Sequence, residues 1–171
     1  MSEIHKYIFG GVLFIVLVGM TNVASQRVGS ADRETVAAAT VRHVLTEIIG
    51  EDTIQGRGEV TDPLYLCLSS EVDVDVKRIA SELASTIIRP IPVKECASNR
   101  VEGDFGMFGA MTYYYAPNGE EAGHLTIAEL KCATPSECMV DIDMVGWGER
   151  YSLKQTGGEW KVSDQRNRWI V

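Results

Sequence analysis

The sequence predicts an α+β fold, in which two amphipathic helices pack on a curved, mostly antiparallel sheet of four to six strands, preceded by an N-terminal hydrophobic helix. Three observations predict it. An apolar run occupies residues 7–20, two helical stripes of apolar residues follow, and from residue 111 onward the pattern is that of strands alone. A doubly wound parallel sheet would need helices between the later strands, and the sequence leaves no room for them.

Residues 1–25 have the pattern of an export signal. A polar start containing Lys6 precedes an apolar run of about 14 residues, and small polar residues follow it. This run is nearer in length to a signal-peptide core than to the roughly 20 residues of a membrane-spanning helix. We expect cleavage after Ala24 or Ser25, or else an uncleaved anchor that holds residues 7–24 in the inner membrane. Both outcomes place the rest of the chain in the cell envelope, as a periplasmic, secreted or anchored protein.

The four cysteines are expected to form two disulfides, because export removes the chain from the reducing cytosol. Four cysteines allow three pairings. Cys132 and Cys138 flank a turn containing Pro135, which would bring their Cα atoms within disulfide reach and leave Cys67 to pair with Cys96. A zinc site would need paired C-x2–4-C knuckles and a redox pair would need C-x-x-C, and neither spacing occurs.

A polar spacer at residues 26–32 leads into a single domain at 33–171, which is long enough for one core. The first helix is predicted at 33–49 with Asp32 as its N-cap. Residues 64–68 predict a buried strand. The second helix is predicted to begin at Asp73 or Asp75 and to end before Pro90 and Pro92, because proline lacks the N–H donor. Its apolar stripe consists of Val76, Ile79, Ala80, Leu83, Ala84 and Ile87.

The later chain predicts strands. Residues 91–96 are expected to be an extended edge segment, and the glycine-spotted stretch 97–109 receives no assignment. Strands follow at 111–116, 124–132 and 138–147. Residues 150–155 and 159–163 predict a hairpin across Gly157 and Gly158, because tight turns need the positive φ that glycine supplies. Residues 166–171 are either a last strand or a docked tail.

The net charge of −8 disfavours nucleic acid as a partner, because an acidic surface repels phosphate. No cofactor or metal site is predicted, since the sequence contains neither a calcium-loop pattern nor a phosphate-binding loop. The weak catalytic candidates are His124 with Asp141 or Asp143, which would form an acid/base pair if their strands were neighbours. The alternative reading places both carboxylates on the solvated face of a strand.

Aromatic residues are frequent on the predicted strands. They either fill the core beneath the helices or line a pocket on the concave side of the sheet. The residues that we single out for a binding surface are Tyr113, Tyr115, Trp147 and Tyr151.

The C-terminal stretch carries a family resemblance. A Y-x-L motif at residues 151–153, a glycine turn and a W-x-V motif at 160–162 resemble the last hairpin of exported NTF2-like domains, which have a cone-shaped α+β fold. The resemblance implies a fold with a pocket and no particular activity. We therefore expect an exported or membrane-anchored domain that binds a partner protein or a small apolar ligand. The alternative is a small cone-fold hydrolase or isomerase that uses the His-carboxylate pair.

Overall fold

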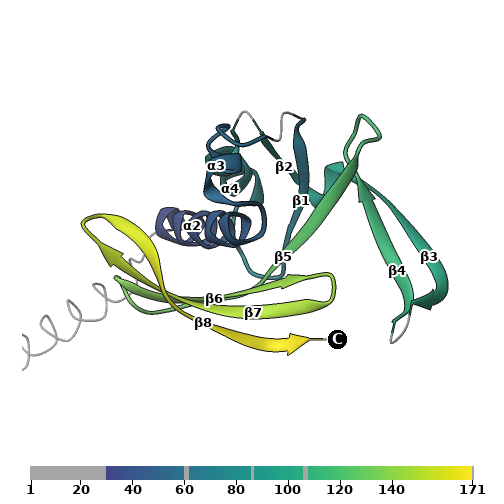
Figure 1. Ribbon diagram of the computed structural model, residues 1–171. Coiled ribbons are helices and arrows are strands. Elements are labelled where there is room, and N and C mark those ends of the chain that lie inside the picture. The colour runs from purple at the N-terminus through teal and green to yellow at the C-terminus, as the bar shows by residue number, and fades with distance from the viewer. Residues whose placement is uncertain (1–29, 60–61, 86, 106–107, 171) are drawn as a thin grey trace, which may run out of the picture. The chain divides into compact units, whose positions relative to one another are not determined.

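In the computed structural model, eight strands of the described part of the chain form a single sheet (Figure 1). The structure describes residues 30–59, 62–85, 87–105 and 108–170. Within these residues 54% lie in strands and 25% in helices. The helices are α2 (Ser30–Ile49), α3 (Glu51–Ile54) and α4 (Val76–Leu83), with a 3-10 turn, η1 (Val93–Glu95).

The predicted α+β fold with two helices on four to six strands is therefore wrong, since the described chain is mostly β. The error has a local cause. Residues 88–92 and 97–105 both form strands, but prolines interrupt the first and glycine occurs in the second, so neither has the alternating pattern by which strands are recognised.

The chain divides into two compact units, Met1–Asp32 and Arg33–Val171, and the second is described here. The predicted export signal and residues 26–29 of the spacer lie outside the described residues. Asp32, the predicted N-cap, lies inside α2, which already includes Ser30. None of the helices in the described part of the chain is both long and apolar enough to cross a membrane.

The sheet combines parallel and antiparallel pairing. Its main path runs β2-β1-β5-β6-β7-β8, and β4 pairs with both β3 and β5. Strand β1 is parallel to β2 and to β5, while the other pairs are antiparallel. The strands are β1 (Leu64–Ser70), β2 (Ile88–Pro92), β3 (Ala97–Phe105), β4 (Phe108–Tyr115), β5 (Glu121–Thr134), β6 (Glu137–Met144), β7 (Trp147–Thr156) and β8 (Glu159–Ile170).

Helix α4 connects β1 to β2 in a β-α-β unit. Asp75 caps it as predicted, because its carboxylate accepts hydrogen bonds from the backbone N–H groups of Lys77 (2.9 Å) and Arg78 (3.2 Å). The helix ends at Leu83, earlier than predicted. Pro90 does not end the helix but lies in β2, at the edge of the sheet, where proline is tolerated.

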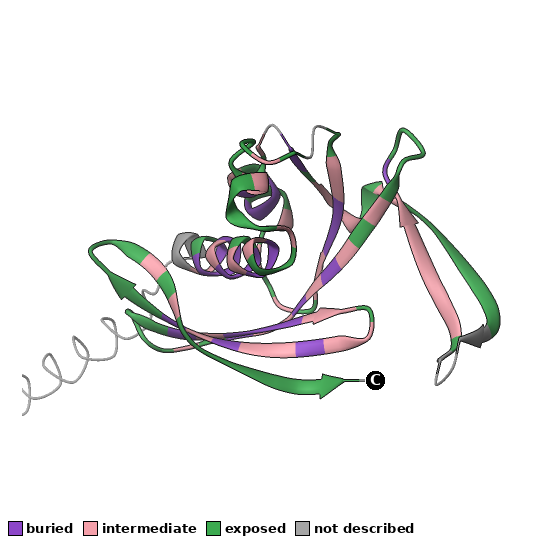
Figure 2. Cartoon of the chain, viewed as in Figure 1, coloured by how far each residue is buried: buried purple, intermediate pink, exposed green. Residues whose placement is uncertain are grey.

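The core lies between α2, α4 and one face of the sheet (Figure 2). Val41 and Val44 of α2 are fully buried, as are Ile127 of β5 and Ile142 of β6. Removing an aliphatic side chain of this size from water contributes about 1.5–3 kcal/mol. Within α4, the predicted apolar residues Ile79, Ala80 and Leu83 are buried against the sheet. The predicted stripe also included Ala84, which is exposed, and Ile87, which lies beyond the end of α4.

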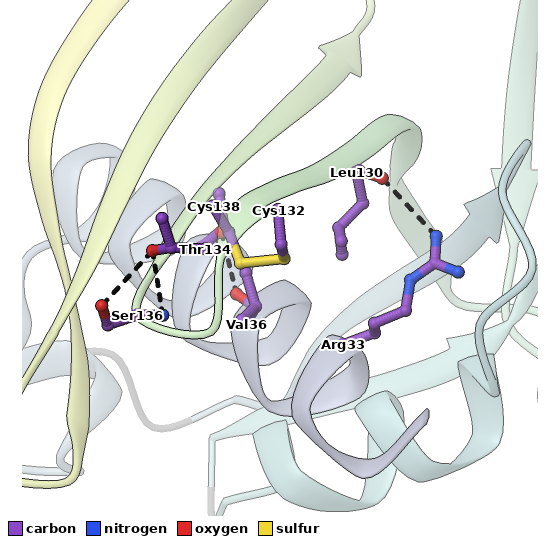
Figure 3. The surroundings of a disulfide bond; sticks show 8 residues. Arg33, Val36, Leu130, Cys132, Thr134, Ser136 and Cys138 are labelled. Atoms are coloured by element: carbon purple, nitrogen blue, oxygen red, sulfur yellow. Dashed lines mark hydrogen bonds between the residues drawn. A yellow bond between two sulfur atoms is a disulfide. The ribbon is translucent and has the colours of Figure 1, made fainter. Parts of the chain in front are cut away.

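Both predicted disulfides are confirmed. Cys67 of β1 bonds to Cys96 with a Cα–Cα distance of 6.3 Å. Cys132 and Cys138 lie directly opposite each other on β5 and β6, with Cα atoms 3.9 Å apart, in a region where Arg33 of α2 donates to the Leu130 carbonyl (Figure 3). Two disulfides fit an exported protein that folds in an oxidising environment.

The last hairpin is also confirmed. Gly157 (φ +62°) and Gly158 (φ +88°) form the turn between β7 and β8, in the left-handed region that favours glycine. Strand β8 continues to Ile170, so the C-terminal residues extend the sheet as a strand.

Candidate functional site

A cavity of about 350 Å³ lies where β1 and β2 end and α4 begins. Parallel strands joined by a helix place their carboxyl ends and the start of that helix at one edge of the sheet, which is where ligands bind in parallel α/β sheets. The cavity is lined by Leu68, Ser69, Ser70, Val74, Asp75, Val76, Lys77, Pro92, Val93 and Lys94.

The cavity combines apolar walls with positive charge. Lys77 forms an ion pair with Glu95 (3.5 Å), whereas Lys94 makes no ion pair with any described residue. The start of α4 is already occupied by carboxylates, because Asp75 caps the helix and Glu34 accepts a hydrogen bond from the Asp75 backbone N–H (3.2 Å). Because Glu95 compensates the charge of Lys77 and Asp75 also lines the cavity, the attraction of the cavity for an anion depends chiefly on Lys94.

The Cys67–Cys96 disulfide fixes one wall of the cavity. Turn η1, which contributes Val93 and Lys94, directly precedes Cys96. Cys67 is fully buried on β1, one residue before the cavity-lining Leu68. The disulfide thus ties the end of β2 and η1 to the central strand.

Ser69 connects the cavity to a polar cluster on β5. Its Oγ lies 3.1 Å from His124 Nε2 and 2.7 Å from Thr126 Oγ1. The His124 ring stacks on Tyr114, with centroids 4.1 Å apart. Burial lowers the pKa of His124 and so favours the neutral ring. In the tautomer that carries its hydrogen on Nδ1, the Nε2 atom accepts a hydrogen bond from the Ser69 hydroxyl.

The contact between Ser69 and His124 was not predicted from the sequence, because the contact depends on parallel pairing between β1 and β5. Ser69 pairs in register with Thr126, and Cys67 with His124. The alternation of His124 and Thr126 on one strand was visible in the sequence. Nothing in the sequence indicated that β1 lies beside β5.

Strands β5 and β6 are neighbours and Asp143 lies opposite Thr126, but the structure shows no hydrogen bond from His124 to Asp141 or Asp143. Asp141 is buried, not solvated, and its two oxygens each accept a hydrogen bond from Arg150 at 2.7 Å. Arg168 adds an ion pair to Asp141 at 3.1 Å and also donates to Asp143 (2.6 Å). Both carboxylates are therefore held by arginines, and the hydrogen-bond partner of His124 among the described residues is Ser69.

The four aromatic residues predicted to bind a partner or ligand occupy different environments. Tyr113 and Tyr115 are half-buried on β4, and Trp147 packs at the border of the core. Tyr151 is fully buried and its hydroxyl donates to Glu149, and burial together with this hydrogen bond raises its pKa. Tyr151 is consequently a core residue and takes no part in a binding surface.

Among the residues that the structure describes, no three His, Cys, Asp or Glu side chains are grouped so that they could hold a metal ion. Comparison with protein-family models, with curated proteins and with solved structures finds no match. The resemblance to NTF2-like domains thus stays a prediction from the sequence.

Proposed function

We propose that this chain is an exported binding domain whose ligand is a small molecule with an apolar body and a negatively charged group. The observation that carries the proposal is the cavity at the ends of β1 and β2, which joins apolar walls to Lys77 and Lys94. Its volume lies at the lower end of the range of about 300–1,000 Å³ for small-molecule sites.

The chemistry of the lining supports this class of ligand. Val74, Val76 and Val93 are half-buried and supply apolar surface, so an alkyl or aromatic body gains free energy by leaving water. Lys94 has no described ion-pair partner and is free to bind a carboxylate or sulfonate. This cavity favours a ligand over the partner protein that the sequence equally allowed.

The place of action belongs to the same proposal. The disulfides fit an oxidising compartment, and the leader at residues 1–25 supports secretion or the periplasm. An uncleaved leader would hold the domain at the inner membrane through residues 7–24. In either case the cavity would bind ligands that are present outside the cytosol.

Fluorescent probes of matched shape test the proposal. We expect the full, disulfide-bonded chain to bind 8-anilinonaphthalene-1-sulfonate, an aromatic anion. Lys94→Glu should weaken this binding about tenfold, which corresponds to about 1.4 kcal/mol. Binding of the neutral N-phenyl-1-naphthylamine should change little.

Lys161→Glu on β8 is the matched control, because it makes the same change in net charge at an exposed lysine that does not line the cavity. Equal loss of anion binding in the Lys94 and Lys161 variants would contradict the proposal. That result would mean that only the overall charge of the protein governs binding.

A further inference from the structure

A second cavity adjoins the proposed ligand site. It has a volume of about 310 Å³ and is lined by residues of α4 and β2, two elements that contact each other. Lys77 of α4 and Pro92 of β2 line both this cavity and the first one. The two cavities are therefore neighbours along α4, the first at the start of the helix and the second farther along it.

An ion pair lies at the boundary between the two cavities. The Nζ atom of Lys77 is 3.5 Å from Oε1 of Glu95 in η1. Glu95 lines only the second cavity, whereas its neighbour Lys94 lines only the first. Both partners of the pair are exposed. An exposed ion pair shifts an equilibrium by at most about fivefold, so a competing anion separates it readily.

The second cavity has small apolar walls and no net charge. Lys77 is the one cation among its described lining residues, and Glu95 compensates that charge. The apolar part of the lining consists of Ala80, Ala84, Pro90 and Pro92. A space of this kind suits an alkyl chain and offers nothing to a second anionic group.

We propose that the two cavities together hold one linear alkyl carboxylate, whose charged group lies at Lys94 and whose chain passes Lys77 into the second cavity. This inference rests on the proposed function, since it takes the anionic ligand of the first cavity as given. As the chain enters, Lys77 leaves Glu95 and turns to the carboxylate of the ligand. Two lysines then hold the anion. A neutral ligand brings no group to replace Glu95, so the ion pair favours anionic ligands.

Chain length should govern affinity at this extended site. Each methylene group that enters the second cavity leaves water and should tighten binding about fourfold. A compact anion such as 8-anilinonaphthalene-1-sulfonate is expected to occupy the first cavity alone. The two kinds of ligand therefore distinguish the two cavities.

Displacement of 8-anilinonaphthalene-1-sulfonate from the full, disulfide-bonded chain by hexanoate, octanoate, decanoate and dodecanoate tests this inference. Ser81→Trp places a bulky ring at an exposed residue of α4 that lines only the second cavity. We expect this change to weaken dodecanoate binding about tenfold, the equivalent of about two methylene groups. Binding of hexanoate and of the sulfonate should persist, which also shows that the variant is folded. Ser98→Trp on β3 is the control, because Ser98 is exposed and lines neither cavity.

Glu95→Gln provides a second test, because the ligand then no longer competes with Glu95 for Lys77. The affinity for dodecanoate should rise up to about fivefold. Glu82→Gln is the matched control. It removes the same charge from another ion pair of α4, in which Glu82 lies 3.3 Å from Arg78, and neither residue lines a cavity.

The outcomes separate this inference from the proposed function. If Lys94→Glu leaves binding of the sulfonate intact, the proposed function itself is wrong. If Lys94→Glu weakens that binding but Ser81→Trp leaves the dependence on chain length as in wild type, the first cavity acts alone and the inference is overturned. Equal gains from Glu95→Gln and Glu82→Gln would also overturn it, since net charge alone would then explain both.

Discussion

The Oγ atom of Ser69, near the end of β1, lies 3.1 Å from Nε2 of His124 on the neighbouring strand β5. Ser69 also lines the cavity at the ends of β1 and β2. A ligand in the cavity would therefore lie beside a residue whose hydrogen bonding depends on the protonation state of a histidine. We therefore expect the stability of the protein to depend on pH through His124.

His124 should make the protein less stable in acid. Burial lowers its pKa below the ordinary 6.5, so the unfolded chain binds the proton more readily than the folded chain. Stability is then lost as the pH falls below about 6.5, until the lowered folded pKa is reached. We expect His124→Gln to lose less unfolding free energy than wild type between pH 7.5 and 5 in urea titrations. A folded-state pKa at or above 6.5, from an NMR titration of His124, would contradict this.

The two disulfides should contribute unequally. Cys67 and Cys96 are separated by 29 residues, and Cys132 and Cys138 by six. Loop-closure entropy then gives about 3–4 kcal/mol for the first and about 2 kcal/mol for the second. Replacing each pair by alanine and measuring denaturation in guanidinium chloride checks the order.

The same two variants separate stability from binding. The Cys67–Cys96 disulfide ties η1 to β1 at the cavity, whereas Cys132 and Cys138 lie elsewhere on the sheet. We expect the alanine pair at 67 and 96 to lose affinity for anilinonaphthalene sulfonate and the pair at 132 and 138 to keep it. If the pair at 67 and 96 keeps its affinity and the pair at 132 and 138 loses it, the Cys67–Cys96 disulfide does not shape the cavity.

Gly148 should tolerate no side chain. A Cβ atom there would overlap the Trp169 ring and come within 2.5 Å of Asp143 Oδ1. We expect Gly148→Ala to cost about 1–3 kcal/mol and to shift tryptophan emission as Trp169 is displaced. Gly123→Ala on β5 is the control, since its nearest neighbour would lie at an ordinary 3.5 Å. Equal effects of the two changes would contradict the packing described for Trp169.

Asp141 should stabilise the sheet through its arginines. Its buried carboxylate accepts two hydrogen bonds from Arg150 and pairs with Arg168. Asp141→Asn removes the negative charge while keeping the volume, and we expect a loss of about 1.5–3 kcal/mol in urea unfolding. The exposed Asp164, which pairs with Arg166, provides a matched change to Asn with an expected loss below about 1 kcal/mol. Similar losses at both positions would show that burial of Asp141 contributes little.

Local patterns in the sequence predicted the elements that they determine. The strand at residues 64–68 and the hairpin at Gly157 and Gly158 lie where apolar patterning and turn chemistry placed them. Both helices also form, although the second ends at Leu83, before the last two residues of its predicted stripe. The disulfide pairing was predicted from the short separation of Cys132 and Cys138 along the chain, which left Cys67 to pair with Cys96. Each of these features depends on residues close to one another in sequence or on a simple limit of distance.

Features that depend on pairing between distant segments were not predictable in this way. The parallel contact of β1 with β5 brings Ser69 to His124, although 55 residues separate them. The burial of Asp141 depends on arginines contributed by β7 and β8. The cavity arises from three segments that meet only after the β-α-β unit has formed. Composition and spacing carry no signal for such long-range contacts, which is why the candidate site emerged from the structure.

Amide chemical-shift mapping tests the central claim most directly. The full, disulfide-bonded chain, labelled with ¹⁵N, is titrated with anilinonaphthalene sulfonate. The account predicts saturable shifts gathered at Ser69, Ser70, Lys77, Val93 and Lys94, around the cavity at the ends of β1 and β2. Shifts confined to the other end of the sheet, around Lys131 and Lys154, or no saturable shifts at all, would contradict it.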